Sequence, residues 1–174
     1  FPRPASRHPR PISDVHDFRM SSPSGWWVPP RGLHDEITGR PVGFGDDGVV
    51  VVLGVGRLSA AEDAVRSARP DDEVTIVVVT SDPAEIGRLA RLRIVDLVGC
   101  LLRVFAADRL PRARIVVDDT GTVPAALGHT SVDDLTEIAV RVRDGLVAAH
   151  ATGRGAGHAA ARHRSPDCGR SGAV

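Results

Sequence analysis

The stretch from Arg109 to Val123 constrains the fold most, because a proline leads there into a short apolar run that ends at a turn. The run Ile115-Val116-Val117 has the β-branched content of a buried strand, and Asp119-Thr120-Gly121 has the residues of a tight turn. Pro111 is compatible with the first residue of a strand, since no ladder hydrogen bond is lost there. The pattern predicts a strand over 115–117 and an antiparallel partner that begins near Val123.

Two continuous apolar runs, Val49–Val55 and Val74–Thr80, have the pattern of strands that are buried on both faces. We expect the first of them in the middle of the sheet. Between them, Ser59–Arg69 carries alanines and a valine at helical spacing and stops at Pro70. After the second run, Ser81-Asp82-Pro83 opens a further helix that is predicted to end near Leu92.

The remaining segments predict two more helices. Ile94–Phe105 mixes a short apolar run with helical spacing around Cys100, and we interpret most of it as helix. A last helix is predicted from Thr130 or Ser131 to Leu146, because its apolar residues fall on one helical face. The resulting order, β-α-β-α-(α)-β-β-α, predicts an α/β fold with a mixed central sheet and helices on both faces.

Composition divides the chain into three parts. Residues 1–30 are rich in Pro, Arg and Ser and are predicted to form a flexible leader, although the Trp26-Trp27 pair is expected to pack on the domain. Residues 31–150 form the predicted domain. Residues 151–174 turn to Gly, Ala, Arg, His and Ser without apolar periodicity, which predicts a disordered tail.

Charge and cysteine content exclude several classes of function. The 22 basic residues balance 22 acidic ones, so no net field would recruit nucleic acid or an anionic membrane. The two cysteines, Cys100 and Cys168, are too far apart in sequence for a metal knuckle. No apolar stretch approaches the roughly 20 residues needed to span a bilayer. We expect a soluble, cytoplasmic protein without a metal or cofactor.

Three segments together resemble the thioredoxin-like superfamily, in particular its TlpA and peroxiredoxin-like branch. These are Leu110-Pro111 entering a strand, Asp118–Val123 leaving it, and Leu33–Val42, which looks like the opening hairpin of that branch. The resemblance covers roughly residues 33–149 and implies a three-layer thioredoxin-like sandwich. It also implies that Pro111 is the cis-proline of the family, whose neighbours in active members present backbone groups to a bound substrate or peptide.

The catalytic motif of that family is absent. Its Cys-x-x-Cys sequence would follow the central strand, where this chain has Leu58-Ser59-Ala60-Ala61. No catalytic residue is therefore assigned, and the expected function is that of a redox-inactive binding or accessory module rather than an enzyme. We expect a protein or peptide partner to bind a groove beside the proline, lined by Gly56, Arg57, Leu58, Ser59, Leu110 and Pro111.

Two alternatives remain open from the sequence. Cys100 could replace the missing thiols and make the protein a thiol-disulfide oxidoreductase, although a buried structural cysteine is the more common explanation. The turn Gly54–Ser59 partly matches a dinucleotide-binding fingerprint, with Asp82 placed to meet a ribose hydroxyl. His129 is interpreted as a capping or surface residue, and His158, His163 and Cys168 match no closed zinc site.

Overall fold

The computed structural model describes residues 19–21, 27–104 and 113–164. Within them a six-stranded sheet has the order β1-β6-β5-β2-β3-β4. Its strands are β1 (Arg19–Ser21), β2 (Gly48–Gly54), β3 (Glu73–Val79), β4 (Ala113–Val117), β5 (Glu137–Arg143) and β6 (Leu146–Thr152). The strands β2, β3 and β4 run parallel, whereas β5 is antiparallel to β2 and β6 to β5. This arrangement confirms the predicted α/β class with a mixed sheet.

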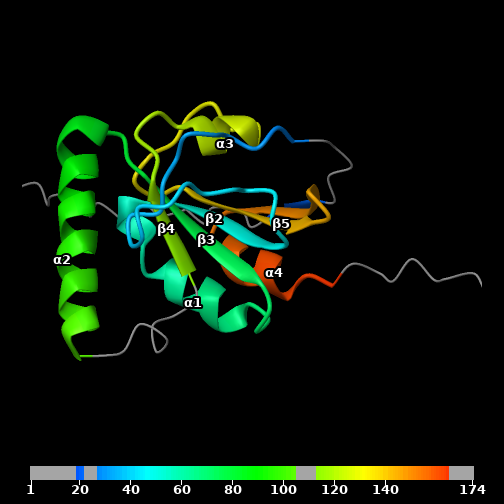
Figure 1. The fold of residues 1–174 in the computed structure, drawn as a ribbon. Coiled ribbons are helices and arrows are strands. Elements are labelled where there is room, and N and C mark those ends of the chain that lie inside the picture. The colour runs from blue at the N-terminus through cyan, green and yellow to red at the C-terminus, as the bar shows by residue number, and fades with distance from the viewer. Residues whose placement is uncertain (1–18, 22–26, 105–112, 165–174) are drawn as a thin grey trace, which may run out of the picture.

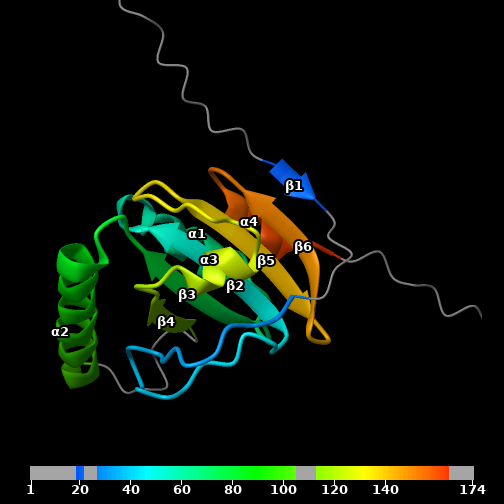
Figure 2. The same ribbon diagram turned by 90° about the horizontal axis from the view of Figure 1, so that it is seen from above.

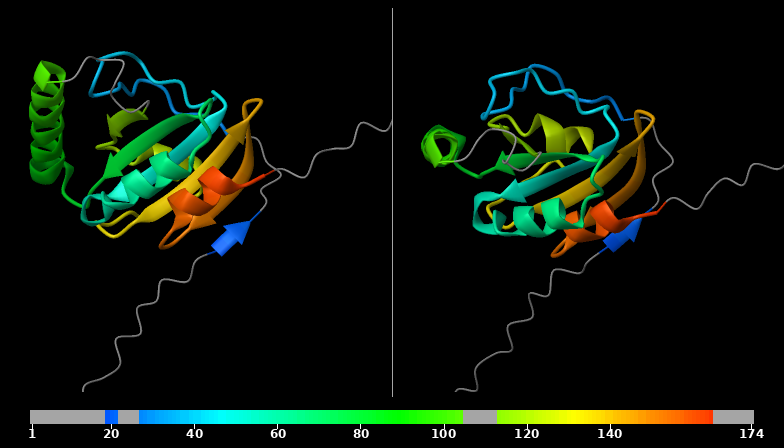
Figure 3. Two further views of the ribbon diagram at one scale, coloured as in Figure 1. Left: turned by 90° about the horizontal axis from the view of Figure 1, so that it is seen from below. Right: turned by 60° about the horizontal axis from the view of Figure 1, so that its bottom comes forward.

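Helices cover both faces of the sheet (Figure 1). The helices α1 (Ala60–Ser67) and α4 (Ala156–Arg162) lie together on one face, as the views from below show (Figure 3). The short helix α3 (Thr122–Ala126) lies on the opposite face (Figure 1). The long helix α2 (Arg88–Val104) follows the turn η2 (Pro83–Gly87) and stands beside the sheet, next to the β4 edge (Figure 2).

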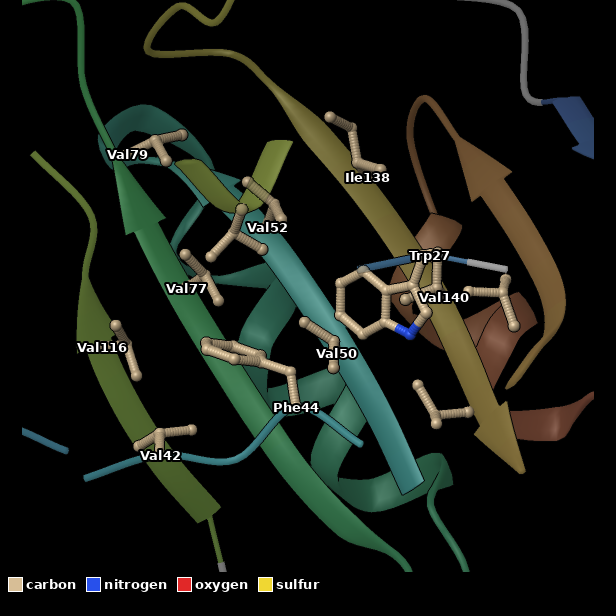
Figure 4. Close-up of a cluster of buried hydrophobic side chains, with 13 residues drawn as sticks. Trp27, Val42, Phe44, Val50, Val52, Val77, Val79, Val116, Ile138 and Val140 are labelled. Carbon is tan, nitrogen blue, oxygen red and sulfur yellow. The ribbon is translucent and has the colours of Figure 1, made fainter. Parts of the chain in front are cut away.

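The core forms two apolar clusters, one on each face of the sheet. On the α3 face, valines of β2, β3 and β5 point toward Trp27 and Phe44, whose rings meet edge to face at 6.3 Å between centroids (Figure 4). On the other face, small and β-branched side chains pack against alanines of α1 and α4. The strands β2 and β3 are buried on both faces, as their continuous apolar runs predicted. The burial of Trp27 confirms that this tryptophan packs on the domain; Trp26 lies outside the described residues.

The predicted last helix is wrong, because Thr130–Leu146 forms instead the loop before β5, strand β5 itself and the turn into β6. Ile138, Val140 and Val142 alternate with residues of the opposite face, which is the period of a strand. The turn between the strands is Asp144-Gly145, with φ of 51° and 72°. Two residues with positive φ form the tight hairpin connection that matches strand twist. The hairpin signal was therefore present, but the helical spacing of the apolar residues masked it.

Three further predictions need correction. Val123 does not begin an antiparallel strand but lies in α3. The Asp118 carboxylate accepts hydrogen bonds from the Val123 amide at 2.8 Å and from Thr120 and Thr122, and these bonds stabilise the start of the helix. The leader contains β1, which pairs with β6. The segment expected as a disordered tail contributes the end of β6 and α4. The alanines of α4 pack against the sheet, but the helix has no large apolar residue from which the sequence could have predicted this packing.

Other predictions are confirmed. Three predicted elements agree with β2, α1 and β3 within one or two residues: the strand Val49–Val55, the helix 59–69 and the strand Val74–Thr80. The predicted helices over 83–92 and 94–105 form one continuous element, η2 with α2, as far as Val104. The expected hairpin at residues 33–42 appears as an isolated antiparallel bridge between His34 and Pro41. No helix of the described ranges is long and apolar enough to cross a bilayer.

A buried ion pair joins the sheet to α4. Arg141, on β5, donates two hydrogen bonds of 2.7 Å from Nη2 to the two carboxylate oxygens of Asp72, and one of 2.9 Å from Nη1 to the Ala161 carbonyl. The two side chains are only 1% and 3% exposed. Burial alone would raise the pKa of Asp72, but hydrogen bonds from Arg141 and from the Arg69 amide hold that pKa below its usual value.

Candidate functional site

The candidate site lies at the edge of the sheet where β2 ends and β5 begins. Leu53 of β2 pairs with Glu137 of β5, and Ile138 pairs with Thr152 at the end of β6. The chain leaves β2 through the turn η1 (Val55–Arg57) and enters α1, while beyond β6 it enters α4 through Gly153–Gly155. Two strand-to-helix turns and the start of a third strand therefore meet at one place.

An ion pair lies at the centre of this edge. Arg57 donates from Nη2 to Oε2 of Glu137 at 2.7 Å, and the other carboxylate oxygen accepts a hydrogen bond from the Gly155 amide, also at 2.7 Å. The Glu137 side chain is 2% exposed and that of Arg57 is 21% exposed. A buried carboxylate is costly unless both oxygens find donors, and here each turn supplies one. Glu137 thus connects the turn after β2 to the turn before α4.

The loop before β5 crosses directly over the turn after β2. The Gly54 amide donates to the Thr136 carbonyl and the Gly56 amide to the Asp134 carbonyl, each at 2.8 Å. A Cβ at Gly54 would lie 2.4 Å from the Asp133 carbonyl oxygen, so only glycine permits this approach. Because these amides already have partners, they are not available to a phosphate, which argues against the dinucleotide-binding interpretation of the turn.

The same loop is held from its other side by Thr80 and Ser81, the residues that follow β3. Asp134 accepts hydrogen bonds from the Ser81 amide at 3.2 Å and from the Thr80 hydroxyl at 2.9 Å. These two donors lower the pKa of the Asp134 carboxyl, because they stabilise its charged form. Asp82, the residue that the dinucleotide interpretation required, instead accepts from the Glu85 amide at 3.1 Å and begins η2. The site is therefore bounded by a loop that is held from two sides.

Two adjacent cavities open on the ion pair. The larger, of about 540 Å³, is lined by the loop before β5 and the ends of β5 and β6; the smaller, of about 300 Å³, lies toward α1 and α4. Both are lined by Arg57, Glu137 and Arg154, so they form one cleft. Its remaining lining includes carboxylates, hydroxyls and the exposed side chain of Leu135. Arg154 is exposed and makes no ion pair with the described residues.

A histidine pair borders the larger cavity. The Nε2 atoms of His129 and His150 are 3.3 Å apart, and the rings stand nearly perpendicular. Burial lowers the pKa of both histidines, and for His150 the charge of His129 lowers it further. His129 is therefore half-buried and paired, rather than the capping or surface residue that we expected. Within residues 19–21, 27–104 and 113–164, no group of three or more metal-ligating side chains comes together.

The structure brings together part of the predicted groove. Arg57 lines both cavities, Ser59 lines the smaller one, and Gly56 lies against the Asp134 carbonyl. Leu58 points elsewhere, into an apolar groove beside α2. Leu110 and Pro111 lie outside the described residues, and the strand after them, β4, begins opposite the start of β3, at the other end of the sheet from η1. The described residues therefore assemble no groove between this turn and the proline.

Cys100 is not the buried core residue that we expected. Its side chain is exposed on α2, a helix that contributes no lining to the cleft. The helical spacing that suggested a core position is real, but α2 stands beside the sheet and not on it, as Figure 2 shows. Cys100 is therefore not part of the described cleft, and its proposed role as a replacement thiol stays a prediction.

Sequence reasoning missed Glu137, Arg154 and the loop 133–136. Each lies in a segment assigned to a helix or to a disordered tail, so none was considered as a site residue. The Asp144-Gly145 turn was the signal that would have placed them, because it fixes β5 and β6 and with them the edge where Glu137 and Arg154 lie. Compared with known proteins, the sequence matches no protein-family model and no curated protein.

Proposed function

We propose that the protein is a redox-inactive, thioredoxin-like module that binds an extended peptide segment of a partner protein in the cleft around Arg57. The order of elements supports the thioredoxin-like part of the proposal. A parallel pair, β2 and β3, is joined by α1, and an antiparallel hairpin, β5 and β6, is followed by the closing helix α4. The resemblance implies this core order, but other residues than expected form the hairpin, and β4 with α3 is an additional strand and helix between α2 and β5.

The place of the cleft supports a binding role. In the superfamily the attacking thiol follows the central strand at the start of a helix, and here the corresponding turn carries Arg57 and no cysteine. The ion pair of Arg57 with Glu137 at the junction of two cavities is the observation that carries the proposal. An arginine–carboxylate pair cannot attack a disulfide, but its remaining donors can bind carbonyl or carboxylate oxygens.

The chemistry of the cleft favours a peptide. Its lining offers two arginines, several carboxylates and hydroxyls, and one exposed leucine, so charges of both signs lie beside an apolar contact. A peptide presents carbonyl oxygens, amides and mixed side chains along its length and can match such a surface, whereas a purely anionic ligand would meet the carboxylates. We expect an acidic side chain or a C-terminal carboxylate to contact Arg154.

A displayed library of random peptides tests this proposal. Selection on the wild-type protein should enrich a common sequence, and the enriched peptides should lose affinity for Arg154→Glu by about tenfold or more. Arg40→Glu is the matched control, because Arg40 is also exposed but lies on the loop 33–42, away from the cleft. Enriched peptides that bind Arg154→Glu as well as wild type, or a folded protein that enriches none, would contradict the proposal.

The exposure of Cys100 supports a second candidate, thiol-disulfide exchange at a single thiol on α2. Its test is the reduction of insulin disulfides by the wild-type protein in the presence of a dithiol reductant. Activity that Cys100→Ser abolishes would establish this candidate, whereas an inactive wild type would remove it. The peptide-binding proposal expects the inactive outcome.

A further inference from the structure

The helix α2 exposes far more apolar surface than a helix in a three-layer domain should. None of its 17 residues is buried, and it stands outside the layers, beside the β4 edge (Figures 1 and 2). One side is held by Arg91, whose guanidinium contacts Glu36 at 2.9 Å, Asp119 at 2.6 Å and the Val117 carbonyl at 3.0 Å. The helix is thus fixed in place while most of its circumference remains in water.

One exposed flank has the spacing of a helix–helix seam. Leu92, Val95, Gly99 and Leu102 follow one another at intervals of three, four and three residues. The three large side chains are 58%, 53% and 47% exposed. This is the spacing by which a narrow apolar stripe packs against a second helix. Soluble monomers rarely leave such contiguous apolar surface open.

Gly99 has no explanation within a single copy. A glycine inside a helix weakens it relative to alanine, yet a Cβ at this position would meet no atom within 4 Å. The packing of the monomer therefore does not require it. In the middle of a seam, however, a residue without a side chain allows the backbone of a second helix to approach closely. The glycine thus points to a helix as the occupant of this flank.

The charges along the flank match a second copy of the same helix. Asp96 and Arg103 each follow a stripe residue by one position, so both lie along the outer border, and neither makes an ion pair with the described residues. In an antiparallel pair related by a two-fold axis, each copy's Asp96 comes within reach of the other copy's Arg103. A parallel pair would need Arg91 for this role, and Arg91 is already engaged.

We propose that the protein self-associates through α2, with two copies of the stripe Leu92, Val95, Gly99 and Leu102 packed antiparallel about a two-fold axis. Two heptads are too short to hold two free peptides together, but here the domain has already formed and fixed the helix. Association therefore does not include the loss of conformational entropy that helix formation would cause. This inference is independent of the proposed peptide cleft, which α2 does not line.

Sedimentation velocity from low micromolar to near-millimolar concentration tests the seam. The wild type should show a monomer–dimer equilibrium, and Leu92→Asp should weaken it by at least about tenfold. Leu97→Asp is the matched control, because Leu97 lies on the same helix with 59% exposure but lines the apolar groove on the other flank. Dimerisation that Leu97→Asp weakens equally, or a wild type that remains monomeric throughout, would overturn the proposal.

Charge reversal tests the antiparallel arrangement. Asp96→Arg and Arg103→Asp should each weaken the dimer, because each places like charges across the seam, and the double variant should recover wild-type association. Both residues are exposed, so all three variants are expected to fold. Failure of the double variant to recover would overturn the antiparallel pairing. If the wild type is monomeric but co-sediments with anionic phospholipid vesicles, and Leu92→Asp does not, a membrane and not a second copy occupies the stripe, which also overturns the proposal.

Discussion

Two arginine–carboxylate pairs join strand β5 to the rest of the molecule, and they differ in how far each is closed. Both have nitrogen–oxygen distances of 2.7 Å. Around Arg141 and Asp72, both carboxylate oxygens and a helix carbonyl are bound and water is excluded. Around Arg57 and Glu137, the carboxylate is equally buried, but the guanidinium borders two cavities and makes no further hydrogen bond with the described residues.

This difference separates a structural role from a binding role. A closed pair exposes no donor to a ligand, and it contributes to fold stability and to the position of α4 on the sheet. In the second pair the carboxylate is buried and the guanidinium is partly exposed. The buried carboxylate fixes the orientation of the guanidinium, while some of the guanidinium donors remain free. We therefore assign the first pair to the fold and the second to the site.

Removing the carboxylate of the closed pair should have the largest effect. Asp72→Ala leaves the Arg141 guanidinium buried without its counter-charge, which is expected to cost about 3–5 kcal/mol of the free energy of unfolding. Chemical denaturation measures this loss. The double variant Asp72→Leu with Arg141→Met should recover much of it, because no buried charge is left unpaired. A loss below about 1 kcal/mol in Asp72→Ala would mean that water reaches Arg141.

Removing the arginine of the open pair should cost less. In Arg57→Ala, Glu137 keeps its hydrogen bond from the Gly155 amide and gains water from the cavities. We expect a loss of about 1–2 kcal/mol in the same denaturation experiment. A loss as large as that of Asp72→Ala would show that the two pairs are equally closed and would remove the distinction on which the proposed site rests.

Acid should act on the histidine pair and on the closed pair in separate pH windows. Because burial lowers the pKa of His129 and His150, the folded state resists their protonation more than the unfolded state does. Stability should therefore be unaffected above about pH 6.5 and should fall as the pH drops through and below that value toward the folded pKa values. The double variant His129→Gln with His150→Gln should flatten this decrease in denaturation curves measured between pH 7 and pH 5. An unchanged decrease would assign it to other groups.

The closed pair responds at lower pH. The pKa of Asp72 lies below its ordinary value, so its contribution to stability is complete above the unfolded pKa of about 3.9 and is lost as the pH falls through the lower folded value. The histidine window and the Asp72 window therefore do not coincide.

The smallest effect is expected from Arg143. Its Nη2 lies 3.6 Å from Asp72, but the side chain is one-third exposed and also contacts Asp47 at 3.2 Å. Arg143→Ala should cost less than about 0.5 kcal/mol, and the cost should shrink further in high salt. A larger loss would indicate that charge near Asp72, and not the closed geometry of Arg141, stabilises this end of β5.

The sequence predicted the parts of the fold whose local signals agree with their environment. Val49–Val55 and Val74–Thr80 are apolar throughout because both faces of the sheet are covered, and they became β2 and β3. The prediction from sequence was wrong where the spacing of the apolar residues fits both the period of a helix and that of a strand. Ile138, Val142 and Leu146 recur at four-residue intervals, which suits a helix and also an alternating strand. The Asp144-Gly145 turn and the long-range pairing with β2 decide between them.

The candidate site could be predicted only in part for the same reason. Arg57 and Ser59, which were predicted to line a groove beside the proline, line a cavity, and they lie together because both follow a strand that was correctly identified. Glu137 and Arg154 were missed, since their positions depend on β5 and β6. The alanines of α4 carry no signal strong enough to distinguish a packed helix from a polar tail, because their small side chains become a core element only against α1 and the sheet.

The most direct test of the proposed function is nuclear magnetic resonance of the ¹⁵N-labelled protein titrated with a peptide from the library selection. We expect the amide shifts to concentrate at Arg57, Glu137, Gly153 and Arg154 and to be smaller in Arg154→Glu. Shifts that concentrate on α2, or that persist unchanged in Arg154→Glu, would contradict the assignment of the cleft as the binding site.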